Sequence, residues 1–234
     1  SLEGQRQLLD DVGHELKTPI TIVRGQLELL DVEDPQQVAQ IRTLAIDELD
    51  RMNRLVADIS LLASVQRHSG VSIEPTDVRG LTETVFRKLS AIPGRHWRLV
   101  ETADAVADLD PGRITQAWFQ LAANANRHGT PGLPIEIGSR VVTDLGDECL
   151  ELWVTDFGPG IAPEAHELIF ERFRREAEGR GESGSGLGLA IVTTIVHAHR
   201  GEVRLESAPA IGSTFTLSLP LGPARANEAS EHHA

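Results

Sequence analysis

The sequence predicts a chain of more than one domain: an all-α helical hairpin, which forms a four-helix bundle when two copies pair, followed by an α+β two-layer sandwich. Two observations predict this order. In the first part of the chain, apolar residues recur at spacings of three and four, as on one face of a long helix. From residue 71 onward, short alternating segments and short helical segments follow one another, which is typical of one sheet covered by helices.

The first helical segment carries one apolar stripe and, away from it, a group of polar residues. At about 100° per residue, His14 lies roughly 200° from two stripe residues, so its imidazole is expected to face solvent. Thr18 follows one turn later on the same side, and Glu15 flanks the histidine. Pro19 lacks an N–H and is expected to disturb the helix. The stripe consists of Leu9, Val12, Leu16, Ile20, Val23, Leu27 and Leu30.

A second periodic segment begins after Asp34, where Pro35 suits the first helical turn. Two amphipathic helices joined by a short turn bury too little area to be stable alone, so we expect two hairpins to pair as a homodimer. The alternative is that the hairpin packs onto the rest of its own chain, which a monomeric mass in solution would favour. The apolar positions of the second helix are Val38, Ile41, Ala45, Leu49, Met52, Leu55, Ile59 and Leu62.

The helical pattern ends near residues 67–70, where glycine and small polar residues indicate a hinge. Beyond it, Asp77 and Asp110 are each placed to cap a helix. Strands are predicted at residues 71–74, 97–100, 107–110, 135–137, 149–154, 201–205 and 214–219. The predicted domains are therefore 1–67, the helical domain; 68–76, the hinge and first strand; 77–222, the sandwich; and 223–234, a tail without order.

Composition excludes several classes of protein. The formal net charge of −13 argues against a general nucleic-acid binder, because no basic surface is in surplus. A single cysteine, Cys149, leaves no disulfide possible within the chain and suits a reducing compartment. No run of about eighteen apolar residues is present, and the first residues do not resemble a secretory signal. We expect a fragment of a larger protein.

Glycine-rich elements in the second half indicate a nucleotide site. Asp156 ends an apolar strand and is followed by Gly158 and Gly160, which let the backbone approach a nucleotide base closely. The Asp156 carboxylate can then accept a hydrogen bond from the exocyclic amine of the base. Further on, Gly-Ser-Gly-Leu-Gly at residues 184–188 leads into a helix, where exposed N–H groups and the helix dipole favour phosphate. Asn124, near the end of a helix over residues 111–128, offers an amide oxygen suited to Mg²⁺.

The segment His-Glu-Leu-Lys-Thr-Pro at residues 14–19 resembles the phospho-acceptor box of sensor histidine kinases. The later order, an asparagine helix, Asp-x-Gly-x-Gly, a phenylalanine pair, Gly-x-Gly-x-Gly and Gly-x-Thr-Phe, resembles their ATP-binding domain, which is similar to those of gyrase B subunits and mismatch-repair ATPases. The resemblance covers residues 8–219. It implies ATP-dependent autophosphorylation on His14, transfer to an aspartate of a response regulator, and phosphatase activity toward that regulator.

The resemblance also implies roles for single residues. Glu15 would hold the second ring nitrogen of His14, and Thr18 would position water for dephosphorylation. Asn124 and Gln120 would bind Mg²⁺, although Gln120 stands where the family generally has asparagine. The ATP-binding positions implied are Asn124, Arg127, His128, Asp156, Gly158, Gly160, Arg175, Gly184, Gly186, Leu187 and Gly188.

Two other classes stay open at this point. A gyrase-like ATPase would hydrolyse ATP without labelling itself, and a degenerate kinase would be a dimeric scaffold that binds ATP and transfers nothing. The resemblance implies ATP and Mg²⁺ as cofactors, a response regulator as partner, and a place on the cytoplasmic side, with membrane attachment only through segments absent from this chain.

Overall fold

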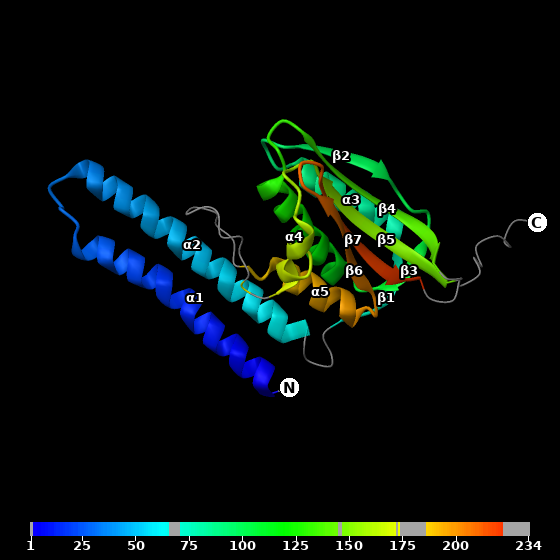
Figure 1. The fold of residues 1–234 in the computed structure, drawn as a ribbon, viewed down its shortest axis with the longest axis horizontal. Helices are drawn as coiled ribbons and strands as arrows, with labels where there is room; N and C mark the ends of the chain where they lie inside the picture. Colours follow the sequence, from blue (N-terminus) through cyan, green and yellow to red (C-terminus); the bar gives the residue numbers. More distant parts are fainter. Residues whose placement is uncertain (1, 66–70, 145–146, 172, 174–185, 222–234) are drawn as a thin grey trace, which may run out of the picture. The chain divides into compact units, whose positions relative to one another are not determined.

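The computed structural model describes residues 2–65, 71–144, 147–171, 173 and 186–221 (Figure 1). The chain divides into two compact units, a helical one and a mixed one, and each is described by itself. The elements are α1 Leu2–Glu28, α2 Pro35–Val65, β1 Glu74–Asp77, α3 Val78–Ser90, β2 His96–Glu101, β3 Val106–Leu109, α4 Pro111–His128, β4 Pro134–Asp144, β5 Asp147–Asp156, η1 Pro163–Ala165, η2 Leu168–Phe170, α5 Gly188–Ala198, β6 Glu202–Ala208 and β7 Gly212–Pro220.

The helical unit contains the predicted hairpin. The turn after α1 is closed by two aspartates: Asp31 accepts from the backbone N–H of Glu33, and Asp34 accepts from the first N–H groups of α2. Helix α1 stays helical through Pro19, contrary to the expected disturbance, and the proline side chain is buried. Its missing N–H leaves one carbonyl without a helical partner, which a long helix tolerates when packing compensates.

The mixed unit is built on a five-stranded sheet of order β2-β4-β5-β7-β6. Strands β2 and β4 run parallel, and the other neighbours are antiparallel. Helices α3, α4 and α5 pack against this sheet, whereas β1 and β3 form a separate two-stranded sheet (Figure 1). The predicted order along the chain, a helical hairpin followed by an α+β two-layer sandwich, is therefore confirmed.

The core of the mixed unit lies between α4 and the inward-facing residues of the central strands. Alternate residues of β5 point to opposite faces, so Leu150, Leu152 and Val154 are buried together. Helix α4 buries one face against them, and the indole N–H of its fully buried Trp118 donates to the carbonyl of Trp153, 3.2 Å away. The helix that carries the candidate metal ligands is thereby held rigidly on the sheet.

Both predicted capping aspartates cap their helices, but the first strand begins later than predicted. Asp77 accepts from the N–H groups of Arg79 and Gly80, and Asp110 accepts from that of Arg113. Residues 71–73 are not in a strand, because the N–H of Ser72 donates to the second carboxylate oxygen of Asp110 at 2.8 Å. The strand therefore starts at Glu74, where pairing with β3 begins.

Three predictions fall outside the described residues. These are the hinge over residues 67–70, the lid arginine Arg175 with the first loop glycine Gly184, and the tail over residues 223–234. They stay predictions. Among the described helices, none combines the length and the apolar character that crossing a membrane requires.

Candidate functional site

His14 lies on α1 with its side chain exposed to solvent, as the helical spacing predicts. Thr18, one turn later, is also exposed, and its hydroxyl donates to the backbone carbonyl of His14 at 3.2 Å. A solvent-facing imidazole on a regular helix can be reached by a bulky reactant. The Thr18 hydroxyl therefore lies one turn from the imidazole on the same exposed side of the helix.

Glu15, beside His14, is held from the second helix by Arg51, whose guanidinium nitrogen lies 3.4 Å from the Glu15 carboxylate. The same guanidinium lies 3.5 Å from the carboxylate of Glu48, whose Oε2 atom is buried without a hydrogen-bond partner. Sharing one cation between two carboxylates restricts where Glu15 can point. Arg51 was not predicted from the sequence, but its spacing of three from Glu48 is a recognisable helix pair.

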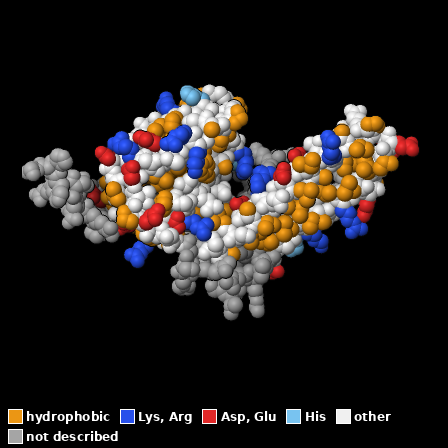
Figure 2. All heavy atoms as spheres, turned by 180° about the vertical axis from the view of Figure 1, so that it is seen from behind, with side chains coloured by type: hydrophobic (Ala, Val, Ile, Leu, Met, Phe, Trp, Pro, Cys, Tyr) orange, Lys and Arg blue, Asp and Glu red, His pale blue; other side chains and the backbone are white. Residues whose placement is uncertain are grey.

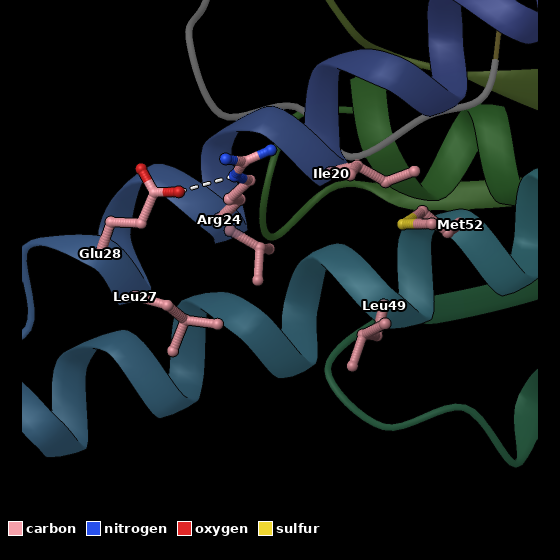
Figure 3. A pocket seen from close by; sticks show the side chains of 7 residues that line it. Ile20, Arg24, Leu27, Glu28, Leu49 and Met52 are labelled. Atoms are coloured by element: carbon pink, nitrogen blue, oxygen red, sulfur yellow. Dashed lines mark hydrogen bonds and ion pairs between the residues drawn. The ribbon is translucent and has the colours of Figure 1, made fainter.

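One side of the helical hairpin is apolar and exposed (Figure 2). A groove of about 420 Å³ lies between α1 and α2, and Ile20, Leu27, Leu49 and Met52 point toward it from the two helices (Figure 3). Half or more of the surface of Ile20, Leu27 and Leu49 is exposed in the single chain. These are residues of the predicted stripes, so the stripes remain only partly covered within one chain.

Asp156, at the end of β5, is the centre of the candidate nucleotide site. Its side chain is only 5% exposed, and its Oδ1 atom accepts from the backbone N–H of Gly158 at 2.8 Å. Burial raises the pKa of the Asp156 carboxyl above its ordinary value, and the N–H groups of Gly158 and Ser213 and the imidazole of His128 offset part of the rise. A buried carboxylate with free acceptor capacity is suited to a ligand amine.

The end of α4 lies directly against this carboxylate. A Cβ atom added at Gly129 would lie 3.5 Å from the Cβ of Asp156, and one added at Gly158 would collide with the carbonyl oxygen of His128. At Gly158, only glycine allows the two backbones to approach so closely. The structure therefore brings together the Asp-x-Gly motif and the end of the asparagine helix, which are about thirty residues apart in the sequence.

Gly160 turns the chain after the motif toward the last strands. It has a φ of +72°, and an added Cβ atom would collide with the carbonyl oxygen of Ala208. The N–H of Ala210 donates to the carbonyl of Pro159 at 2.7 Å, and the N–H of Ile161 donates to the hydroxyl of Ser207 at 2.8 Å. The loop after Asp156 is thus fastened to the β6–β7 turn.

Sequence reasoning missed two residues of this turn. Ser213 pairs with Asp156 across β5 and β7 and gives it a backbone N–H, while its hydroxyl lies 3.0 Å from that of Ser207. The Gly-x-Thr-Phe motif at residues 212–215 was noted, but it did not indicate which strand end would lie beside it. Only the sheet order, with β5 next to β7, reveals that contact.

The predicted phosphate loop meets the asparagine helix at one point. A Cβ atom added at Gly188, the first residue of α5, would lie 3.0 Å from the amide oxygen of Gln120 on α4. Gly186 has a φ of +69°, and its carbonyl accepts from the N–H of Phe173 at 2.9 Å, so the two ends of the long loop lie together. Asn124 is half-buried on α4, Arg127 and His128 are exposed, and Leu187 is fully buried.

Comparison with known proteins adds to this geometry. Two family profiles match: the His Kinase A (phospho-acceptor) domain over residues 4–68, and the histidine kinase-, DNA gyrase B- and HSP90-like ATPase over residues 109–223. The chain is also 34% identical over 222 residues to the probable sensor histidine kinase TcrY of Mycobacterium tuberculosis, covering 92% of this chain and 46% of TcrY. The chain belongs to the sensor histidine kinases. The sequence resemblance is thereby confirmed.

Other relatives of this histidine kinase agree. It is 34% identical to the histidine-protein kinase/phosphatase MprB of Mycobacterium ulcerans, covering 88% of the chain and 41% of MprB. The solved structure of the histidine kinase AdeS of Acinetobacter baumannii has a TM-score of 0.66 at 26% identity, covering 90% of this chain and 98% of that one. The chain spans less than half the length of the curated relatives it matches.

The donor atoms on α4 fit the ATP and Mg²⁺ that the kinase family implies. Amide oxygens, such as those of Asn124 and Gln120, are hard ligands that suit Mg²⁺. In nucleotide sites, most other ligands of this ion are phosphate oxygens and water. Within the part of the chain that the structure describes, no three His, Cys, Asp or Glu side chains gather as a metal site of their own.

Proposed function

We propose that this chain transfers the γ-phosphoryl group of ATP to a ring nitrogen of His14, passes it to an aspartate of a response regulator, and also dephosphorylates that regulator. The observation that carries the proposal is the exposed imidazole of His14 beside Glu15, which Arg51 holds, in a chain whose buried Asp156 accepts a hydrogen bond from Gly158. Phosphohistidine formation after incubation with γ-labelled ATP is the direct test.

The chemistry assigns one task to each group. The unprotonated ring nitrogen of His14 forms a bond to the γ-phosphorus while the bond from that phosphorus to the bridging oxygen of ADP breaks, and ADP leaves with its electron pair. Glu15, restrained by Arg51, accepts a hydrogen bond from the other ring nitrogen and keeps the productive tautomer. Asn124 and Gln120 would hold Mg²⁺, which would supply positive charge to offset that of the phosphates. Arg175 is proposed to act on the γ-phosphate.

Binding of ATP is assigned to the predicted domain over residues 77–222. Asp156 accepts from the exocyclic amine of adenine, Gly158 and Gly160 let the base approach, and Arg127 and His128 lie beside the phosphates. The segment 184–188 binds the phosphates through its N–H groups at the start of α5. We place the domains at residues 1–67 and 77–222, and we propose that the linker at 68–76 lets the second domain bring nucleotide to His14. We also place the chain on the cytoplasmic side. Recovery of the protein in an extracytoplasmic fraction would contradict that location.

We expect two chains to pair through the apolar side of the hairpin. Introducing charge there, in the double variant Leu27→Glu and Leu49→Glu, should weaken dimerisation by about 3 kcal/mol or more, on the order of 100-fold, because each leucine is buried twice in a symmetric interface. Sedimentation equilibrium measures the effect. Val32→Glu, a 77% exposed position in the hairpin turn, is the matched control and should leave the dimer intact. A wild-type chain that is monomeric at micromolar concentration contradicts the pairing.

Thr18 is assigned to dephosphorylation. Removing its hydroxyl in Thr18→Ala should slow dephosphorylation of the phosphorylated regulator by about tenfold, because the attacking water loses a partner that orients it. Autophosphorylation should change less than about twofold. The control is Thr43→Ala on α2, whose hydroxyl also donates to a backbone carbonyl four residues earlier. Equal dephosphorylation rates for Thr18→Ala and Thr43→Ala would show that Thr18 has no such role.

A further inference from the structure

Arg95, in the turn before β2, has a guanidinium that reaches three acceptors at the end of α4. Its Nε donates to the side-chain oxygen of Asn126 at 2.9 Å, one terminal nitrogen donates to the backbone carbonyl of Asn126, and the other donates to the carbonyl of Thr130 at 3.2 Å. The last carbonyls of a helix have no partner inside it, so a cation that binds them fixes where the helix ends.

The segment that Arg95 holds is the one that lies against Asp156. Residues 126–130 include His128, whose carbonyl oxygen lies against Gly158, and Gly129, which approaches the Cβ of Asp156. A shift of this segment would move the backbone that lies against Asp156 and Gly158. Because interiors are close-packed, a displacement at one end of α4 cannot be absorbed locally.

We propose that Arg95 is a positioning residue for nucleotide binding: it sets the end of α4 against Asp156 and thereby the affinity for ATP. The inference rests on the proposed function and deepens it. The hydrogen bonds of the Arg95 guanidinium go to Asn126 and Thr130, so we assign it an action through residues 126–130 rather than through contact with nucleotide. The expected consequence is a change in the KM for ATP with little change in the rate at saturating ATP.

The geometry also explains why an arginine is needed. Its planar fork presents several N–H donors in fixed directions, and here three nitrogens each have an acceptor. A lysine ammonium keeps the positive charge but cannot span acceptors that far apart. Arg95→Lys should therefore behave more like Arg95→Ala than like the wild type.

The strand that follows this turn provides a matched control. Arg98, three residues later on β2, forms an ion pair with Glu136, and its side chain is 59% exposed. It makes no hydrogen bond to α4 among those the structure describes. Arg98→Ala removes one positive charge three residues away and leaves the end of α4 intact, so it separates positioning from a general loss of positive charge.

The experiment measures autophosphorylation of the dimeric chain against ATP concentration, with binding of a non-hydrolysable ATP analogue as a second readout. Arg95→Ala should raise the KM for ATP and the Kd of the analogue about tenfold, because the three hydrogen bonds from the charged guanidinium are lost. The rate at saturating ATP should stay within about twofold of the wild-type rate. Arg98→Ala should match the wild type. Asn126→Ala, which removes one acceptor only, should give a smaller rise of about threefold and covers the case in which Arg95→Ala fails to fold.

The outcomes separate this inference from the proposed function. If wild-type chain binds no ATP analogue, the proposed function fails. If wild type binds and labels itself but Arg95→Ala and Asn126→Ala have the affinity of Arg98→Ala, the positioning role of Arg95 is wrong and the proposed function stands. A fall in the saturating rate with unchanged KM likewise overturns the inference.

Discussion

Asp156→Asn is expected to weaken ATP binding by about 3 kcal/mol, on the order of 100-fold, because a charged acceptor and one of its lone-pair sites are lost together. In the wild type the carboxylate accepts from the N–H groups of Gly158 and Ser213 and keeps capacity for a ligand amine. An amide has one acceptor atom, and its NH₂ group faces donors. Calorimetric titration with a non-hydrolysable ATP analogue measures the loss.

The same variant should not lower stability, which separates recognition from folding. Because burial raises the folded-state pKa of Asp156 above its ordinary value of 3.8, its contribution to the free energy of unfolding is full below that value and is lost as the pH rises through the folded-state pKa. Burial disfavours the charged form of this carboxyl, whereas an amide has no charge to desolvate. Urea unfolding at neutral pH should therefore place Asp156→Asn within about 1 kcal/mol of the wild type or above it.

Asp147→Asn is the matched control, since this exposed aspartate begins the strand that Asp156 ends. It should change neither ATP affinity nor stability. An unchanged ATP affinity in Asp156→Asn would contradict the proposed recognition of adenine by Asp156. An equal loss of ATP affinity in both variants would show a general effect of charge.

Gly160→Ala should destabilise the mixed unit by about 3 kcal/mol. A side chain at a φ of +72° costs about 1–2 kcal/mol, and the collision of its Cβ with the carbonyl of Ala208 adds a comparable overpacking cost. Because the displaced loop begins at Asp156, ATP affinity should fall in the molecules that remain folded. Urea unfolding followed by tryptophan fluorescence, together with analogue titration, measures both effects.

Gly132→Ala separates the two causes. Gly132 also has a positive φ, +88°, but an added Cβ atom would find no neighbour within 4 Å. This variant should lose only about 1 kcal/mol from backbone strain and keep its ATP affinity. Equal destabilisation by Gly160→Ala and Gly132→Ala would mean that the approach to Ala208 contributes nothing.

Much of the fold was predictable because local signals and global packing agree. The two apolar stripes, the prolines and aspartates at helix starts and the alternating strands each depend on residues close in sequence. The outward direction of His14 followed from helical spacing alone. The strand predicted at residue 71 begins instead at Glu74, because the N–H of Ser72 bonds to Asp110, 38 residues away, and no local pattern indicates such a bond.

The candidate site was predictable only in part, for the same reason. Motif residues such as Asp156 are recognisable by type and spacing, whereas their supports are not. Ser213 reaches Asp156 because β7 lies beside β5, and Arg51 reaches Glu15 because the two helices are antiparallel. Arg95 reaches Asn126, 31 residues later in the chain, from the turn before β2. These partners are ordinary residues in sequence, and only tertiary structure gives them a role.

The central claim is that His14 receives the γ-phosphoryl group. The wild-type chain, incubated with γ-labelled ATP and Mg²⁺, should become labelled with an acid-labile, alkali-stable phosphate that moves to an added cognate response regulator. His197→Gln, an exposed histidine at the end of α5, should label like the wild type, and His14→Gln should not label at all. Label that survives in His14→Gln contradicts the account, as does a wild type that hydrolyses or binds ATP without ever forming phosphohistidine.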